Sequence, residues 1–413
     1  MAKPKLALIP ATQGSKLYSV LPADGVGDFT FSRGSAATRI NKDGLIETVA
    51  SGVSRLNYPL IDGVVNGCPS HLLEPSKTNL IQYSENIGNS AWGTNAAGVI
   101  KTLDISKIAP NGISGVYKIE NNTSSSNGPF CEDTVSLSNG STYTFSVYLY
   151  NDGNISNNNS YIYIFDSNNG QRKVFIDASK TNEWYRLSIT AEIGASSSVE
   201  TAGIQLTSGD GDNIYFWGAQ LEQGSYPTSY IPNYGTSAGI TRAAETANGA
   251  GDASTFNDSE GVLMLEISAL ANDSNIEAIS INANNADNRL ALFKWNVSNR
   301  IQIRVNIAGN TPIDAGVSLS NIKDLNKISL KYKSGDYALW INGFEVYVNS
   351  LADTPIGLSN LSFDSNGADG VPFRGNTKQI QYFDSALNDS DLEKITSWTS
   401  FTDLANGQTY SIK

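Results

Sequence analysis

Apolar and polar residues alternate along much of the chain, and this period of two residues predicts β-strands. In the segment 143–150 (YTFSVYLY), the odd positions are large and apolar, while the even positions are Thr, Ser, Tyr and Tyr. Such a period places successive side chains on opposite faces of a sheet. Comparable patterns occur at 161–166, 184–189 and 214–221. We therefore expect about eight short strands between residues 81 and 240, a number typical of a jelly roll.

A second group of strand patterns occupies the last third of the chain. At 301–307 (IQIRVNI), isoleucine and valine alternate with Gln, Arg and Asn. The tight-turn sequences SGD at 334–336 and NG at 342–343 separate apolar stretches, so the segment 326–349 is predicted to form a three-stranded antiparallel meander. The sequence SDLE at 390–393 has the spacing of a capping box, with Ser390 and Glu393 in its two positions, and predicts one short helix near the C-terminus.

The first 80 residues contain few large apolar side chains. Phe29 and Phe31 fall on one side of a short extended piece, and the turn sequence NKDG at 41–44 predicts a small hairpin. Because so short a region makes a thin core, we expect it to dock on its neighbour or on other subunits. The alternative is an N-terminal extension packed on its own sandwich.

The segment 241–257 (TRAAETANGAGDASTFN) consists of small and polar residues and shows neither the period of a strand nor that of a helix. We interpret it as a domain linker. The predicted fold class is all-β, with two consecutive antiparallel β-sandwich (jelly-roll) domains preceded by a small N-terminal β-hairpin attachment region. The predicted division is an attachment and oligomerisation region at 1–80, a jelly roll at 81–240, a linker at 241–258 and a second β-sandwich at 259–413.

Composition narrows the classes of function. The chain of 413 residues carries a formal net charge of −12 and only 28 lysines and arginines, so binding to nucleic acid or to anionic membranes is not expected. The apolar run in the N-terminal sequence MAKPKLALIP is too short for a signal peptide or a membrane span. We expect a protein that is assembled inside a cell and does not insert into a membrane.

Cysteine and histidine are too scarce for several kinds of chemistry. Cys68 and Cys131 are the only cysteines, and we interpret them as two free, buried thiols. His71 is the only histidine, which leaves no Cys/His cluster for zinc. For His71 we expect a packed or surface imidazole in place of a catalytic one.

Aromatic residues opposite a core face offer flat apolar surfaces to sugar rings, and neighbouring polar groups bind the sugar hydroxyls. The odd or even position of each residue along the predicted strands (its parity) places six residues on such a face, and we nominate them for a glycan-binding site. They are Tyr148, Tyr150, Trp184, Arg186, Phe216 and Gln220. The alternative is that these residues pack under a loop or against the neighbouring domain.

Three acidic residues fall in loops rich in Asn and Gly. Asp166, Asp210 and Asp212 supply the hard oxygen ligands that Ca²⁺ prefers, so a structural calcium site is a hypothesis for this region. Solvated turn carboxylates are the alternative, and no other cofactor is expected.

Three motifs resemble segments of bacteriophage virion proteins. The sequence FSRGSAATRINKDGLIE at 31–47, followed by LEPSKTNL at 73–80, resembles a recurrent region of phage structural proteins. The sequence NLIQYSENIGNSAW at 79–92 resembles the opening of their carbohydrate-binding-module-like β-sandwiches. The aromatic strand and PTSYIP sequence within 213–232, followed by TRAA at 241–244, resemble the closing part.

The last third resembles a different β-sandwich. ISLKYK at 328–333, YALWINGFEV at 337–346 and the tail KQIQYFDSALNDSDLEKIT at 378–396 resemble the concanavalin A-like, or laminin-G-like, lectin fold. A fold of this kind says little about its ligand.

Together these resemblances imply a non-enzymatic structural component of a phage virion, such as a head or tail fibre, spike or decoration subunit that binds host cell-surface glycans. The expected partners are further copies of the chain in a trimer or dimer, other virion proteins through the N-terminal region, and the glycan. The expected location is the surface of the particle, after assembly in the bacterial cytoplasm. The alternatives are a polysaccharide depolymerase, which needs a pair of carboxylates, and a bacterial lectin-like surface protein.

Overall fold

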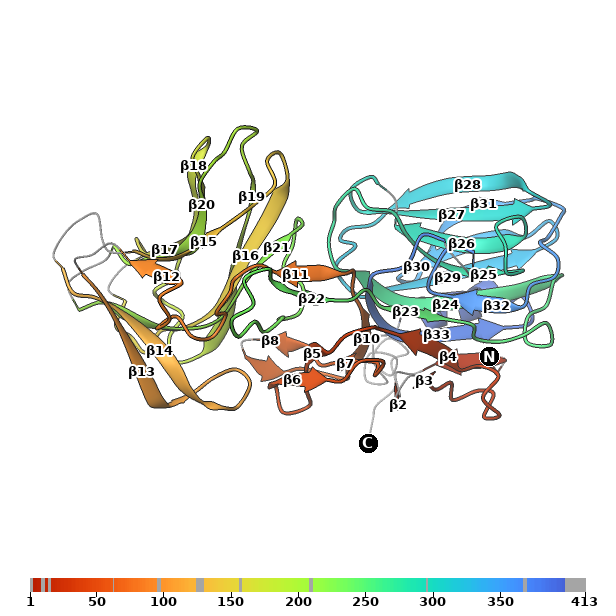
Figure 1. The fold of residues 1–413 in the computed structure, drawn as a ribbon. Helices are drawn as coiled ribbons and strands as arrows, with labels where there is room; N and C mark the ends of the chain where they lie inside the picture. The colour runs from red at the N-terminus through yellow and green to blue at the C-terminus, as the bar shows by residue number, and fades with distance from the viewer. Residues whose placement is uncertain are drawn as a thin grey trace.

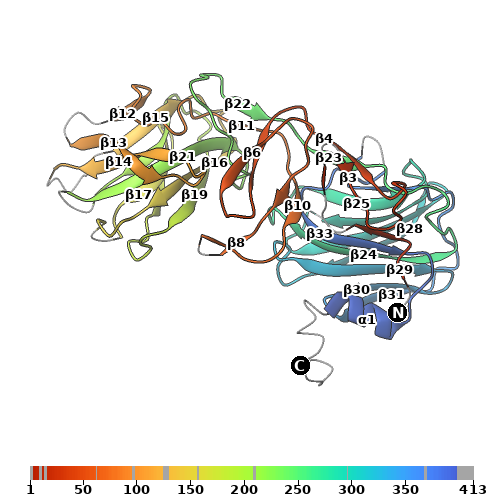
Figure 2. The same cartoon turned by 90° about the horizontal axis from the view of Figure 1, so that it is seen from below.

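The computed structural model describes residues 3–8, 12–13, 16–61, 63–94, 98–123, 130–155, 158–207, 211–294, 296–366 and 370–397. Figure 1 shows two lobes of β-strands, and Figure 2 shows the same two lobes from below, with N-terminal strands between them and along the second lobe. The described residues contain one α-helix, α1 (Asp389–Ser397), and none long and apolar enough to cross a membrane. The predicted all-β class is confirmed.

The first lobe contains two five-stranded antiparallel sheets. In order across the sheet, one consists of β12 (Trp92–Thr94), β15 (Phe130–Val135), β20 (Glu200–Gln205), β17 (Tyr161–Asp166) and β18 (Gly170–Phe175). The other consists of β13 (Val99–Ile108), β14 (Ser114–Asn121), β21 (Asn213–Gln223), β16 (Thr142–Tyr150) and β19 (Trp184–Glu192). These strands outnumber the eight or so predicted, because β12, β13 and β14 lie where the alternation is short or interrupted by polar residues.

The core of the first lobe is the apolar face that the alternation predicts. Phe145, Val147 and Leu149 of β16 are fully buried and belong to one cluster with Ile162 and Ile164 of β17. Burying one such side chain stabilises the fold by about 1.5–3 kcal/mol. The inward face predicted for the segment 143–150 is therefore confirmed.

A bulge in β21 changes which side chains face this core. Gly218 has a φ of +68°, and the register of β21 against β16 shifts beside it. As a result, Phe216 before the bulge and Leu221 after it both lie in the core. Counting by twos back from Gln220 puts Phe216 on the outer face, and that prediction is wrong because the extra residue at the bulge inverts the parity.

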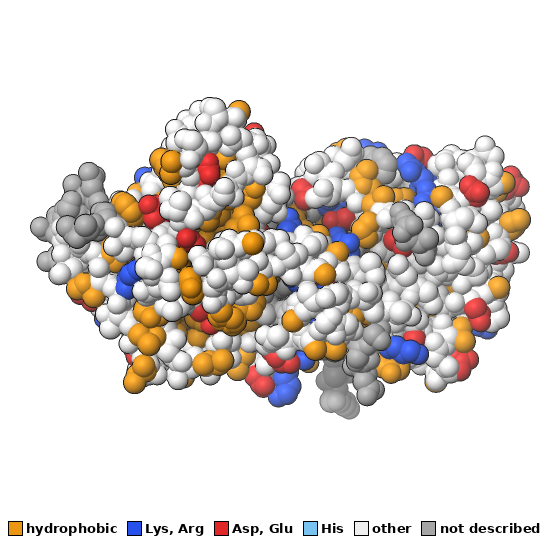
Figure 3. Space-filling model, viewed as in Figure 1, with side chains coloured by type: hydrophobic (Ala, Val, Ile, Leu, Met, Phe, Trp, Pro, Cys, Tyr) orange, Lys and Arg blue, Asp and Glu red, His pale blue; other side chains and the backbone are white. Residues whose placement is uncertain are grey.

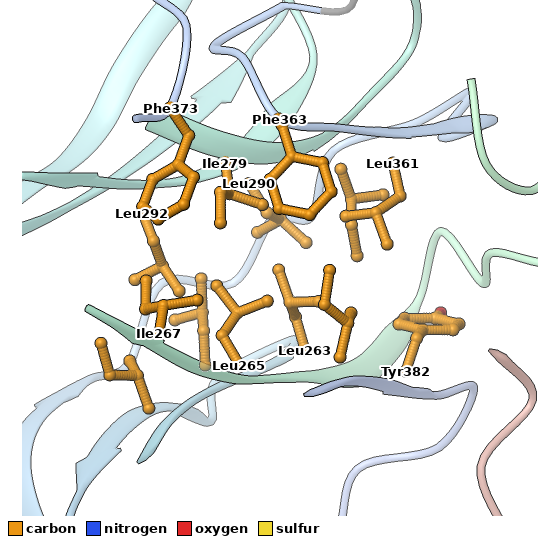
Figure 4. Close-up of a cluster of buried hydrophobic side chains, with 14 of the residues drawn as sticks. Leu263, Leu265, Ile267, Ile279, Leu290, Leu292, Leu361, Phe363, Phe373 and Tyr382 are labelled. Atoms are coloured by element: carbon orange, nitrogen blue, oxygen red, sulfur yellow. The ribbon is translucent and has the colours of Figure 1, made fainter. Parts of the chain in front are cut away.

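The second lobe also has two sheets, which enclose the core shown in Figure 4. One of them begins at its edge with β31 (Phe344–Asn349) and continues with β30 (Tyr337–Ile341), β29 (Asn326–Lys333), β24 (Glu260–Ala269) and β33 (Gly375–Phe383). The other contains β28 (Asn310–Ser318), β27 (Arg300–Ile307), β26 (Arg289–Lys294), β25 (Glu277–Asn282) and β32 (Asn360–Ser362). Leu263 and Leu265 of the first sheet face Ile279 and Leu290 of the second.

The local turn signals of this lobe have mixed outcomes. Asn342 and Gly343 have φ values of 50° and 88°, as a two-residue hairpin turn requires, and the predicted meander β29–β31 is confirmed. The prediction that Ser390 and Glu393 form a capping box is wrong, because Asn388 caps α1. Its Oδ1 accepts a hydrogen bond from the backbone N–H of Asp391 at 2.9 Å.

The N-terminal region completes the larger sheet of the second lobe. Two of its strands, β1 (Leu6–Leu8) and β10 (Ser70–Leu73), pair end to end along the same edge of β33, and β7 (Leu56–Asn57) pairs with β10. Leu6 lies opposite Tyr382, and His71 lies opposite Thr377. The structure thus shows an extension packed on its own sandwich, the alternative weighed above. Attachment to other virion proteins stays a prediction.

A second part of the N-terminal region enters the core itself. Strand β4 (Phe29–Ser32) pairs with β3 (Lys16–Leu17) on one side and with β23 (Thr246–Asn248) on the other. Strand β3 pairs in turn with β2 (Thr12–Gln13). Phe29 and Phe31 are buried in the core of the second lobe, and the ring of Phe29 lies 5.0 Å from that of Phe363. The thin core expected from the sequence is therefore merged with a larger one.

The remaining short pairs hold the N-terminal region against the first lobe. The predicted hairpin at 41–44 is present, formed by β5 (Ala37–Ile40) and β6 (Ile46–Val49). Strand β8 (Leu60–Ile61) pairs with β9 (Val64–Val65), and β11 (Lys77–Asn79) pairs with β22 (Ile240–Arg242).

The segment 241–258 is not the exposed connection that its composition suggests. It contributes to β22 and contains β23, and both Ala247 and Ala250 are fully buried in the core of the second lobe. Small residues here allow close packing, which composition alone does not distinguish from a flexible linker. The domain boundaries given above stay predictions.

Five buried charged side chains join the N-terminal region to this segment, and we call them the Arg55 cluster. Arg55 donates to Glu74 Oε2 at 2.8 Å and to Glu245 Oε1 at 2.8 Å, and Arg33 donates to Glu245 Oε1 at 2.7 Å. Arg242 pairs with Glu74 Oε2 at 2.7 Å. Because a buried ion is costly unless it is paired, each member depends on the others.

The cluster gives a physical role to three motif positions, Arg33, Glu74 and Arg242. Glu74 also accepts hydrogen bonds from the backbone N–H and the hydroxyl of Ser229, at 2.8 and 2.6 Å. Burial by itself raises the pKa of Glu74, but the charges of Arg242 and Arg55 outweigh it and lower that pKa to about 2. The motifs therefore meet at one ionised, buried junction.

His71 lies beside this junction as a packed imidazole, as expected. Its ring lies 6.0 Å from Phe31 and 5.9 Å from Phe363, and neither ring nitrogen has a hydrogen-bond partner within the described part of the chain. Burial, aided by the charge of Arg55, lowers the pKa of His71 to about 3. Of the two free cysteines, Cys131 is buried as predicted, whereas Cys68 is exposed and that prediction is wrong.

Replacing His71 by leucine is expected to reduce the acid sensitivity of the protein. The folded-state pKa of about 3 lies below the ordinary 6.5, so the unfolded chain takes up the proton first and stability falls as pH drops from 6.5 towards 3. Between pH 7.5 and 5, wild type should lose about 2 kcal/mol relative to His71→Leu. Urea unfolding of both proteins at pH 7.5, 6.5 and 5 measures this, and parallel pH profiles would contradict it.

Candidate functional site

Four of the six residues nominated from the sequence lie together on the outer face of the sheet that contains β16 and β19. The ring of Tyr150 lies 5.5 Å from that of Trp184, and the guanidinium of Arg186 lies 5.3 Å from the ring of Tyr148. Arg186 also donates to Ser146 Oγ at 2.8 Å. The aromatic face predicted for these four residues therefore exists.

Much of this face is covered by other parts of the chain. Trp217 is buried against Tyr230, whose ring lies 4.8 Å away, and Ile46 of β6 belongs to the same apolar cluster. Gln220 is fully buried, and its side-chain oxygen accepts a hydrogen bond from the backbone N–H of Ile231 at 2.7 Å. Packing against neighbouring segments, the alternative given above, accounts for Gln220, while Phe216 lies in the core.

The uncovered part is a groove of about 650 Å³ between this face and the hairpins of the N-terminal region. Tyr148, Tyr150 and Trp184 line it. The ammonium of Lys107 lies 2.9 Å from the ring centroid of Tyr150, and the indole N–H of Trp184 donates to the carbonyl of Ile108 at 2.9 Å. These contacts hold both rings in place but also occupy part of their surface.

The opposite sheet of the first lobe presents a second aromatic face, which the sequence reasoning missed. We call it the β17 face. Its members alternate with core residues along each strand and lie side by side on neighbouring strands. Tyr161 lies opposite both Phe175 and Gln205, and Tyr163 lies opposite Lys173. The β17 face consists of Phe130, Glu132, Tyr161, Tyr163, Gln171, Lys173, Phe175 and Gln205.

This face combines rings with polar groups. The rings of Tyr161 and Phe175 lie 5.8 Å apart, and the ammonium of Lys173 lies 4.6 Å from the first and 5.3 Å from the second. The hydroxyl of Tyr161 donates to Gln171 Oε1 at 3.0 Å. Phe175 is 50% exposed, so its ring is open to solvent beside amide and ammonium donors, whereas Tyr161 and Tyr163 are buried.

A carboxylate lies in the middle of the β17 face. Glu132 accepts hydrogen bonds from the hydroxyls of Tyr163 and Thr201, the second at 2.6 Å. Gly203 lies between Glu132 and Tyr163 in the register, and its missing side chain lets the Tyr163 hydroxyl reach the carboxylate. Burial, followed by the hydrogen bond to Glu132, raises the pKa of Tyr163. Tyr163 therefore stays protonated and donates a hydrogen bond to Glu132.

The signal for this face was present in the sequence. Tyr161, Tyr163 and Phe165 alternate with Ile162 and Ile164, so one side of the strand is aromatic and the other is aliphatic. The same test of parity nominated Tyr148 and its neighbours. Applied to 161–165, it also identifies this second surface.

The aspartates proposed for calcium are not brought together. Asp166 is buried, forms an ion pair with Arg172 and accepts the backbone N–H groups of Asn168 and Asn169 at 2.9 and 2.7 Å. Asp212 lies near the Tyr161 end of β17, opposite to the Asp166 end, and Asp210 lies outside the described residues. Within those residues no group of three His, Cys, Asp or Glu side chains could hold a metal ion.

Comparisons with known proteins bear on the first lobe. A family model described as a carbohydrate binding domain matches residues 85–213. This match supports glycan binding by a β-sandwich of carbohydrate-binding-module type. No curated protein matches the sequence.

Several solved structures are similar in fold, with low identity. The CBM40 module of the Ruminococcus gnavus IT-sialidase bound to α2,3-sialyllactose is 16% identical, with a TM-score of 0.29, over 34% of this chain and 84% of that one. Domain 4 of a Geobacillus stearothermophilus GH43 arabinanase in complex with arabinotriose is 13% identical, with a TM-score of 0.30, over 37% and 73%. The C-terminal family 22 module of a Clostridium thermocellum protein is 19% identical, with a TM-score of 0.27, over 37% and 97%.

Proposed function

We propose that this chain binds glycans through the β17 face of its first lobe. The observation that carries the proposal is the open ring of Phe175 beside Tyr161, with the ammonium of Lys173 and the side-chain amide of Gln171 next to them. An aromatic ring covers the apolar side of a sugar, and the neighbouring polar groups bind its hydroxyls.

Two further observations favour this face over the groove at Tyr150. All members of the β17 face lie within the segment 85–213 that matches the carbohydrate binding domain, whereas the groove also needs Leu45 and Leu60 from the N-terminal region. In addition, the side-chain contacts given above for the β17 face are made by residues of its own sheet. Hairpin β5–β6 of the N-terminal region instead packs on the face that carries Tyr148 and Tyr150. The groove stays a second candidate.

Replacing Phe175 by alanine is expected to weaken glycan binding roughly ten- to a hundredfold, because a ring that covers a sugar contributes about 1.5–3 kcal/mol. Calorimetry with arabinotriose, xylohexaose, maltohexaose and 3′-sialyllactose measures the effect. Tyr234→Ala, which removes a ring that is 70% exposed outside this face, is the matched control and should bind as wild type. Equal binding by Phe175→Ala and wild type contradicts the proposal.

We further propose that the protein acts as a surface component of a phage virion, without catalysis, as the motif resemblance implies. The support is that Arg33, Glu74 and Arg242, which belong to those motifs, form one buried cluster. A concanavalin A-like role of the second lobe and assembly as a trimer or dimer belong to the same proposal. Mass spectrometry of purified particles and light scattering of the protein test them, and release of reducing ends from the four sugars would contradict the absence of catalysis.

A further inference from the structure

A cleft of about 1,000 Å³ lies between the two lobes. On one side it is lined by β11 of the N-terminal region and by the turn that follows β21 of the first lobe, and on the other by residues 273–277 and Arg374 of the second lobe. Figure 3 shows side chains of both charge signs in the hollow between the lobes. The volume is at the upper end of the range of about 300–1,000 Å³ found for small-molecule sites.

One carboxylate in the lining has an unused acceptor. Glu277, the first residue of β25, is 5% exposed, and its Oε2 has no hydrogen-bond partner among the residues that the structure describes. A buried polar atom without a partner costs free energy, which a ligand that brings a donor would recover. Burial, with a smaller contribution from Asp273, raises the pKa of Glu277 to about 7 against the opposing charge of Lys294.

The other charged groups of the cleft already have partners. Asp273 accepts a hydrogen bond from the ammonium of Lys294 at 2.7 Å and lies 3.4 Å from the hydroxyl of Ser225 across the cleft. Lys77 donates to the backbone carbonyl of Gln223. Arg374 donates to the backbone carbonyl of Glu245. Glu277 therefore differs from its charged neighbours in having an oxygen left for a ligand.

The surroundings also indicate the kind of ligand. The ammonium of Lys77 lies 5.9 Å from the ring of Tyr226, and the lining also holds Arg374, Asp273 and Glu277, so two positive and two negative side chains favour neither charge sign in a ligand. A neutral hydroxyl supplies a donor to Glu277 without placing a further charge among them. Tyr226, which is half-buried, offers a ring to the apolar side of such a ligand.

We propose that the cleft between the lobes is a second binding site, for a neutral oligosaccharide, in which a sugar hydroxyl donates a hydrogen bond to Glu277 Oε2 and a sugar ring packs on Tyr226. The site goes beyond the function proposed above, since it shares no residue with the β17 face. A ligand bound in this cleft contacts both lobes, so the second lobe also takes part in glycan recognition.

Hydrogen–deuterium exchange of the full chain, with and without xylohexaose and maltohexaose, tests the two sites separately. Ligand is expected to protect peptides that span 223–226 and 273–277 in addition to peptides that span 161–175. In Glu277→Leu, protection of the cleft peptides should need roughly ten- to a hundredfold more sugar, while the β17 face responds as before. Glu277→Gln, which keeps an acceptor, should lie nearer to wild type.

Protection at 161–175 without any at 223–226 and 273–277 overturns the second site and leaves the first in place. The reverse pattern overturns the first and supports the second. If Glu277→Leu fails to fold, as judged by its thermal unfolding, Tyr226→Ala replaces it and is expected to weaken protection of the cleft in the same direction. Unchanged protection in a folded variant of either residue also overturns the proposal.

Discussion

Replacing Arg55 by alanine is expected to lower the free energy of unfolding by about 3–5 kcal/mol. Arg55 is fully buried and donates to Glu74, Glu245 and the carbonyl of Thr38, so its loss takes a donor from three buried acceptors, while Arg242 still pairs with Glu74 and Arg33 with Glu245. The lost charge-assisted hydrogen bonds and the cavity left by the side chain account for most of the cost. Urea unfolding at pH 7 measures it.

Two controls separate this effect from the loss of any arginine. Arg39 pairs with Glu47 at 3.0 Å on the surface of hairpin β5–β6, and Arg39→Ala should cost less than about 1 kcal/mol. In the Arg55→Ala background, Glu74→Gln should lower the stability further, because it removes the carboxylate that pairs with the buried Arg242. If Arg55→Ala costs no more than Arg39→Ala, the cluster does not hold the N-terminal region as described.

Replacing Phe29 by alanine is expected to cost about 3–5 kcal/mol, although Phe29 is far in sequence from the lobe that it stabilises. Its ring lies 5.0 Å from that of Phe363 in the core of the second lobe. The cavity left by the ring should loosen β32, so amide exchange at Asn360–Ser362 should rise together with the loss of stability.

The matched control is Phe344→Ala on strand β31 of the second lobe. Phe344 is 72% exposed, so its replacement should change the free energy of unfolding by less than about 0.5 kcal/mol. A stable Phe29→Ala protein with unchanged exchange in β32 would show that the N-terminal region does not share the core of the second lobe.

Local periodicity predicted the strands of this chain but not their long-range partners. Side-chain type alternates along the segment 143–150 because one face of the strand packs on the core and the other faces outward. This pattern can be recognised from consecutive residues alone. The pairing of Leu6–Leu8 with the last strand, β33, has no such local signal. It depends on an edge that forms only when the rest of the second lobe has folded.

The candidate sites were predictable to different extents. Tyr148, Tyr150 and Trp184 follow from parity within straight strands, and the same reasoning fails at Phe216 because one extra residue at Gly218 shifts the register. The environment of Glu277 could not be read from the sequence. Its unpaired oxygen and its neighbours Lys294 and Arg374 depend on a fold that brings together residues widely separated along the chain.

The shared edge of β33 has a consequence for the order in which the chain folds. Strands β1 and β10 both pair with β33, which is synthesised long after either of them. Until then Phe29 and Phe31 lack the core that buries them, and exposed apolar residues on unfinished chains promote aggregation. We therefore expect chains that stop before Gly375 to be recovered as aggregates, even though most of their strands have already been made.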